Sequence, residues 1–132
     1  MTKIILVAGT ANTGKTKSIR LFLENLGIFH EKRNGDLVLV VPPLATGKKR
    51  ILGIATGGDN LNVVSKSLTF IDQHNWDAII CASKSQGVTL GYVQRFAAIH
   101  KAQLVIINTK RVKPGAVAAA IQSTAAQISK NL

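Results

Sequence analysis

Residues 9–16 of this chain read Gly-Thr-Ala-Asn-Thr-Gly-Lys-Thr, and this loop limits the folds open to the sequence more than any other feature. The apolar run 3–8, rich in β-branched residues, precedes the loop and predicts a buried strand. Apolar residues at helical spacing follow it over 14–26 and predict a helix. The glycines allow a tight turn in which backbone N–H groups converge, and the helix adds its positive N-terminal end. The sequence therefore predicts a strand, loop and helix unit with an anion site at the loop.

The spacing G-x-x-x-x-G-K-T resembles the P-loop (Walker A) pattern of the P-loop NTPase superfamily, and the resemblance is sharp over residues 3–26. It implies binding of a nucleoside triphosphate with Mg²⁺, in which Lys15 reaches the β- and γ-phosphates and the hydroxyl of Thr16 is a metal ligand. The residues expected to bind the nucleotide are Gly9, Thr10, Ala11, Asn12, Thr13, Gly14, Lys15, Thr16 and Lys17. The alternative is a glycine-rich turn that binds nothing, and the flanking strand and helix argue against it.

The length and composition of the chain favour one domain, residues 1–132, because 132 residues are enough for one core and too few for two. Hydrophobic residues make up 46% and charged residues 17%, which indicates a buried α/β sheet rather than disorder. The apolar run before Gly9 is too short for a signal peptide or a membrane span, so no membrane partner is expected. The single cysteine, Cys81, lies in an apolar strand pattern and fits a reducing cytoplasm.

Strand and helix patterns alternate along the rest of the chain. Two strand-like runs, 28–32 and 36–41, flank Asn34-Gly35, which is a strong hairpin signal. Later strands are expected at 50–55, 77–82 and 102–108, and helices at 60–74, at 89–100 and from Pro114 onward. Val117, Ile121 and Ile128 form the apolar stripe of the last helix. Following the chain direction predicts a mostly parallel sheet with one antiparallel strand from the hairpin 28–41. The resemblance implies that this sheet belongs to a three-layer α/β fold of the P-loop NTPase type. Ligands bind such sheets at the carboxyl ends of the parallel strands.

Asp59 is the acidic residue expected to complete a metal site with Thr16. P-loop sites use an Asp after a second strand to hold Mg²⁺, and of the six acidic residues Asp59 alone is predicted to follow the carboxyl end of a parallel strand. Thr56-Gly57-Gly58 separates it from the apolar run, which departs from the usual pattern, and the alternative is that Asp59 only caps the next helix. The following residue is Asn60 rather than Glu, so fast hydrolysis is not expected. Asn60 and Gln86 are candidates for orienting a water, or ordinary capping and loop residues.

Two further lysines are expected at the same edge of the sheet. Lys84 follows the strand 77–82 and is a candidate for contacting the γ-phosphate, with a solvated loop lysine as the alternative. Thr109-Lys110 matches the first half of the Asn/Thr-Lys-x-Asp motif by which P-loop GTPases bind guanine, but Val112 stands where the Asp would be. We therefore expect ATP rather than GTP, with Lys110 packing on the base.

The charge of the chain favours polyanionic partners, since 17 Lys and Arg against 6 Asp and Glu give a formal charge of +11. The positive charge expected near the loop is larger than one nucleoside triphosphate with Mg²⁺ should need. A nucleic acid or an acidic protein is therefore a second candidate partner. Aromatic residues are only 5%, which argues against a platform for stacking single-stranded bases. An oligomer in which Arg33 or Arg111 reaches a neighbour's nucleotide is compatible with the sequence.

Three functions are compatible with these features. The favoured one is a slow Mg²⁺-dependent ATPase or nucleotide switch, with Lys15, Asp59 and Lys84 as the catalytic candidates and Thr16 and Asp59 as metal ligands. The second is a small nucleotide or phosphoryl kinase, which the surplus of positive charge favours and the short connections disfavour. The third is a basic nucleic-acid-binding module with a regulatory ATP site.

Overall fold

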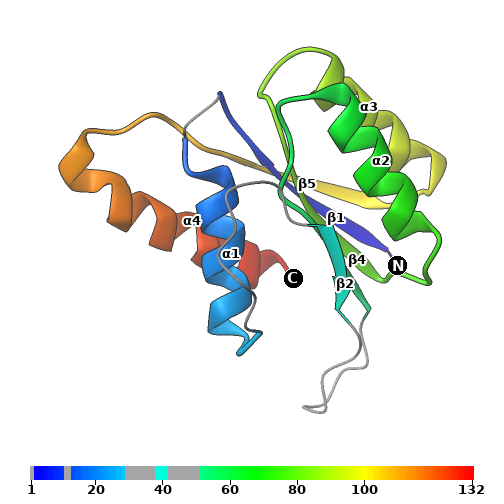
Figure 1. Cartoon of the computed structure of the whole chain (residues 1–132), viewed down its shortest axis with the longest axis horizontal. Coiled ribbons are helices and arrows are strands. Elements are labelled where there is room, and N and C mark those ends of the chain that lie inside the picture. Colours follow the sequence, from blue (N-terminus) through cyan, green and yellow to red (C-terminus); the bar gives the residue numbers. More distant parts are fainter. Residues whose placement is uncertain (1, 11–12, 29–37, 42–50) are drawn as a thin grey trace.

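The computed structural model describes residues 2–10, 13–28, 38–41 and 51–132. Within these residues five strands form one sheet in the order β2-β3-β4-β1-β5, and four α-helices pack on it (Figure 1). The strands are β1 (Lys3–Ala8), β2 (Val38–Val41), β3 (Leu52–Ala55), β4 (Ala78–Ser83) and β5 (Gln103–Asn108). The helices are α1 (Lys15–Asn25), α2 (Leu61–Asp72), α3 (Val88–Ile99) and α4 (Val117–Asn131), and the 3₁₀ turn η1 (Pro114–Ala116) precedes α4.

The strand β1 lies between β4 and β5 and is parallel to both, and β3 is parallel to β4. This position explains the unbroken apolar run of its sequence, because a central parallel strand is covered on both faces. At the other side of the sheet β2 runs antiparallel to β3, with Val38 opposite Ala55 and Val41 opposite Leu52. This is the direction expected for the run 36–41. The remainder of the expected hairpin, 29–37, lies outside the described residues.

The helices form one layer on each face of the sheet, which confirms the expected α/β class with three layers. On one face, Ile5 of β1 shares a core with Phe22 of α1 and Ile128 of α4. On the opposite face, Ile4 shares a second core with Leu68 of α2 and with residues of α3. Figure 1 shows α1 and α4 together on one side and α2 and α3 on the other. Alternate residues of the same strand therefore hold both helical layers to the sheet.

The carboxyl ends of the parallel strands meet at one edge of the sheet. Ala8, at the end of β1, is level with Ser83 of β4 and Asn108 of β5, and Ala55 of β3 is level with Cys81. The described residues that follow these strands, namely 9–10, 13–14, 56–60, 84–87 and 109–113, consequently lie at this edge. We call it the carboxyl edge. Asp59 and the described residues of the loop, 9–10 and 13–16, are thus brought to the same edge, as the predicted chain direction required.

No helix in the described part of the chain combines the length and the apolar character that crossing a bilayer requires.

Cys81 provides a test of the buried sheet. It lies in β4 with 2% of its surface exposed, and burial raises the pKa of its thiol to about 12. Since the thiolate is the reactive form, we predict that a chromogenic disulfide reagent at pH 8 leaves the native protein unlabelled and reacts with one thiol per chain in guanidinium. Rapid labelling of the native protein would contradict the burial of β4.

Candidate functional site

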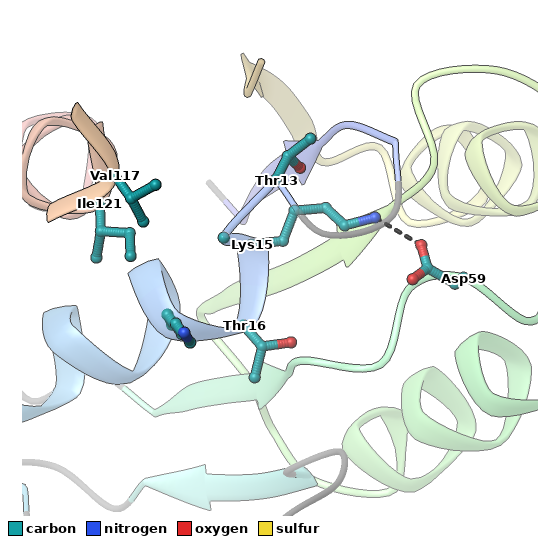
Figure 2. A pocket seen from close by; sticks show the side chains of 8 residues that line it. Thr13, Lys15, Thr16, Asp59, Val117 and Ile121 are labelled. Carbon is teal, nitrogen blue, oxygen red and sulfur yellow. Dashed lines mark hydrogen bonds and ion pairs between the residues drawn. The ribbon is translucent and has the colours of Figure 1, made fainter. Parts of the chain in front are cut away.

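Lys15, the first residue of α1, is the centre of the carboxyl edge. Its side chain is only 6% exposed, and its Nζ donates to the carbonyl of Gly9 at 2.8 Å, to Oδ1 of Asp59 at 2.6 Å and to the carbonyl of Ser83 at 3.2 Å. An ammonium group has three N–H donors, so each donor has one partner. Lys15 therefore joins the segments that follow β1 and β3 to the last residue of β4. Figure 2 shows its contact with Asp59.

Asp59 is more open to solvent than its partner. Its side chain is 49% exposed, whereas Lys15 is nearly covered. The carboxylate consequently offers one oxygen to the lysine while the group remains accessible from outside. A buried cation without partners would be strongly destabilising, and the three oxygens around Lys15 offset that cost.

The residues Thr56-Gly57-Gly58 explain how Asp59 reaches Lys15 although β4 lies between β3 and β1. A Cβ at Gly58 would lie 2.5 to 2.7 Å from the carbonyl group of Ala82 and the N atom of Ser83. The chain therefore passes over the end of β4 with its backbone almost in contact, which requires a residue without a side chain. The unusual spacing between the strand and Asp59 is the length needed for this crossing.

The N-terminal cap of α2 is Asn60 and not Asp59. Oδ1 of Asn60 accepts a hydrogen bond from the N–H of Asn62 at 2.8 Å, and the backbone of Asn60 is extended as at most N-caps. This removes the alternative that Asp59 is present only to cap the helix. It also gives Asn60 a structural role of its own, since its side-chain oxygen is used within α2.

Thr16 lies beside this ion pair. Its Oγ1 donates a long hydrogen bond of 3.5 Å to the carbonyl of Thr56, the residue that follows β3. A bond of this length is weak, so the hydroxyl is easily released to another partner. Thr16 and Asp59 thus present two oxygens, one neutral and one anionic, from neighbouring segments.

The segment after β5 supports the loop from the other side. The backbone N–H of Thr109 donates to the carbonyl of Ala8 at 2.8 Å, and the hydroxyls of Thr109 and Thr13 lie 2.7 Å apart. Thr13 also donates to the carbonyl of Thr10 at 2.9 Å. Thr109 therefore contributes to the site through the shape of the loop, a role that its place in the sequence did not predict.

A cavity of about 300 Å³ lies in front of Lys15 (Figure 2). It is lined by Thr13, Gly14, Lys15, Thr16, Lys17, Asp59, Val117 and Ile121. Lys15, Thr16 and Asp59 make one end polar, and the side chains of Val117 and Ile121, on α4, make the other end apolar. The sequence indicated these two residues only as part of the helix stripe, because it does not show that the start of α4 lies against the start of α1.

Several predicted residues lie outside this cavity. Lys84, Gln86 and Lys110 are at the carboxyl edge with exposed side chains and do not line it. Thr10 is exposed, and Ala11 and Asn12 lie outside the described residues. The cavity therefore contains the second half of the 9–16 loop, together with Asp59.

The carboxyl edge is strongly positive. Five exposed cations lie on its segments or at the start of α1: Lys17, Lys84, Lys110, Arg111 and Lys113. Within the described part of the chain none of them forms an ion pair, and the acid at this edge, Asp59, is already bonded to Lys15. The edge is thus an attractive surface for anions.

The chemistry available here is anion binding together with coordination of a hard cation. The N-terminal end of α1 and Lys15 attract an anion such as phosphate, and Thr16 and Asp59 are oxygen donors of the kind that Mg²⁺ prefers. The described residues contain no group of three His, Cys, Asp or Glu side chains around one point. Mg²⁺ that binds together with a phosphate chain needs only one or two protein oxygens, so this donor set fits it.

Comparisons with known proteins do not assign the chain. No family model matches it, and no curated protein gives a significant match. The functional argument therefore rests on the geometry of the carboxyl edge.

The crossing at Gly58 can be tested by adding a methyl group. Gly58→Ala must push the segment away from β4, so we predict a loss of about 1–3 kcal/mol in the free energy of unfolding, measured with urea. The matched control is Gly91→Ala, because a Cβ at Gly91 in α3 meets nothing within 4 Å. That variant should be more stable than the parent by up to about 1 kcal/mol. Equal effects of the two changes would show that Gly58 does not pass close to β4.

Proposed function

We propose that this protein is a P-loop protein that binds a nucleoside triphosphate with Mg²⁺ in the cavity before Lys15, and that it acts as a slow ATPase or nucleotide switch. The observation that carries the proposal is the 2.6 Å contact between Lys15 and Asp59, beside Thr16 at the start of α1. These residues come from segments 44 positions apart and supply a cation for phosphate and two oxygens for a metal.

Phosphate binding is supported by the loop and by the lysine it surrounds. The backbone N–H groups at the start of α1 point into an anion site, and the helix end favours negative charge. The Lys15 ammonium is bonded to Asp59. Phosphate oxygens of a triphosphate in the cavity would compete with that carboxylate for the same N–H donor. The Lys15 ammonium would then change one partner, while the carbonyls of Gly9 and Ser83 would hold it at the site.

The metal role proposed for Thr16 and Asp59 follows from the same exchange. A carboxylate released from Lys15 would be free to hold Mg²⁺ directly or through water, and the Thr16 hydroxyl would give up only a weak bond to Thr56. Bound Mg²⁺ supplies charge neutralisation on the phosphate oxygens. Mg²⁺ would pair with Asp59 and the phosphates would pair with Lys15, so we infer that nucleotide and Mg²⁺ bind cooperatively.

Slow turnover is supported by the side chains around Asp59. The next residue, Asn60, uses its side-chain oxygen in the cap of α2, and Gln86 is exposed outside the cavity lining. Neither is held in a position to orient a water molecule. Lys84 is likewise exposed, so a γ-phosphate contact from it requires that its side chain turn toward the cavity.

The exposed cations of the carboxyl edge favour a second candidate function, a module that binds nucleic acid through its phosphates and is regulated by the nucleotide. Lys84, Lys110, Arg111 and Lys113 exceed the charge that one Mg²⁺-bound triphosphate balances. DNA or RNA retention that falls steeply with salt would support this function, and no retention at low salt would remove it. A phosphoryl kinase would use the same cations for an acceptor phosphate, and transfer of label from ATP to nucleoside monophosphates would identify it.

The ion pair gives a test in which two variants change affinity in opposite directions. Lys15→Ala should weaken ATP binding roughly 10- to 100-fold with or without Mg²⁺, because charge-assisted bonds to phosphate are lost. Asp59→Asn should bind metal-free ATP about threefold more tightly than the parent, because the competing carboxylate charge is gone. In the same variant the affinity gained by adding Mg²⁺ should shrink.

The measurement is calorimetric or fluorescent-analogue titration in Mg²⁺ and in EDTA. Asp72→Asn is the matched control, since Asp72 bonds to Trp76 and His100 at the far end of α2. No ATP binding at millimolar concentration, or binding that Lys15→Ala leaves unchanged, would refute the proposed function.

Measuring the release of phosphate from ATP tests the expected slow turnover. We predict turnover on the order of 10⁻³ s⁻¹, the scale of P-loop GTPases that act without a partner protein's arginine. Asn60→Ala should lower the free energy of unfolding by about 1 kcal/mol through loss of the cap and leave turnover per folded molecule unchanged. A variant that stays folded and binds ATP but loses turnover would instead assign the water-orienting role to Asn60.

A further inference from the structure

We propose that Val117 and Ile121 of α4 form the wall on which the nucleobase packs, and that this wall holds adenine and guanine with little discrimination. The inference rests on the proposed function and deepens it, because it assigns the apolar end of the same cavity. It revises the sequence-based expectation in two respects. The base contact moves from Lys110 to α4, and the preference for ATP over GTP becomes small.

The two ends of the cavity fix the direction of the ligand. Lys15, Thr16 and Asp59 stand at one end, and only that end suits a triphosphate with its metal. Figure 2 shows Val117 and Ile121 at the other end, facing the first turn of α1. A nucleotide whose terminal phosphates meet Lys15 must therefore extend its sugar and base along the start of α1 toward α4.

The apolar wall is attached to the phosphate loop. A Cβ at Gly14 would lie 3.2 Å from Cγ1 of Ile121, so Ile121 packs directly on the loop's second glycine. Val117 is one helical turn earlier, on the same face of α4, and is 38% exposed although it is apolar. Because Ile121 touches the loop itself, the base wall and the phosphate site are held at a fixed separation. An aromatic base lying on these two side chains covers surface that water now reaches.

Nothing on this wall is suited to reading the edge of a base. In the described lining the carboxylate is that of Asp59, which is at the opposite end and bonded to Lys15. The hydroxyl of Thr13 is engaged with Thr10 and Thr109, and Lys110 is exposed outside the lining. Apolar walls discriminate by size and shape, and they reject weakly a ligand that differs only in its polar groups. Adenine and guanine have the same bicyclic shape, so both fit.

Equilibrium binding to the full chain in Mg²⁺ tests the inference with ATP, GTP, CTP and inorganic tripolyphosphate as probes. We expect ATP and GTP to bind within about threefold of each other, and CTP to bind more weakly because its single ring covers less of the wall. Tripolyphosphate, which has no base, should bind about tenfold more weakly than ATP.

Val117→Ser isolates the wall, and Val88→Ser is its matched control. Each valine is the first residue of its helix and is exposed, with 38% for Val117 and 69% for Val88, but only Val117 lines the cavity. Val117→Ser should weaken ATP and GTP about fivefold and leave tripolyphosphate unchanged. Val88→Ser should change none of the three. Unchanged tripolyphosphate affinity also shows that the variant is folded.

The outcomes separate this inference from the proposed function. If tripolyphosphate binds as tightly as ATP and Val117→Ser changes neither affinity, the base does not lie on α4 and the inference is overturned while the phosphate site stands. A preference for ATP over GTP, or the reverse, of more than about 30-fold overturns the weak discrimination. If neither ATP nor tripolyphosphate binds the parent protein, the proposed function fails and the inference fails with it.

Discussion

The buried ammonium of Lys15 is the interaction on which the carboxyl edge depends. Removing a cation from water costs several kcal/mol even after the protein relaxes, and the position is tolerable only because three oxygens surround the charge. Those oxygens come from Gly9, Asp59 and Ser83, so no single segment supplies them. The chain paths after β1 and β3 and the last residue of β4 must therefore face one point. The two glycines before Asp59 let the chain cross the end of β4, and the cap at Asn60 starts α2 directly after Asp59.

The sequence predicted the parts of this arrangement that depend on local pattern. The β-branched run 3–8 predicted β1, because a strand that is covered on both faces is apolar throughout. The spacing after the loop predicted α1, because a helix buried on one face repeats its apolar residues every three to four positions. The position of Asp59 followed from chain direction and from the scarcity of acidic residues, and the structure confirms that it lies at the carboxyl edge, bonded to Lys15. The role of Asp59 as a metal ligand is a proposal, because the position of a carboxylate does not show what it binds.

The residues that sequence reasoning missed are those whose role depends on which elements are neighbours. Thr109 supports the loop only because β5 pairs with β1, and the order of strands is not written in any local period. The spacing of Val117 and Ile121 predicted only an apolar helix stripe, because this spacing is the same whether the side chains face a core or a cavity. Lys84 and Lys110 were placed at the correct edge, but the direction of a long exposed side chain cannot be derived from its position in the chain.

The contacts of Thr13 with Thr109 join residues 96 positions apart, and Thr109 reaches the carbonyl of Ala8 across 101 positions. During synthesis the ribosome must therefore extend the chain well past residue 109 before the loop at 9–16 acquires its supports. Contacts of such high sequence separation form late and slowly. A growing chain would carry the eight residues of this loop long before their supports are made, so the proposed ligand binding would report completion of the whole sheet and not the presence of the loop.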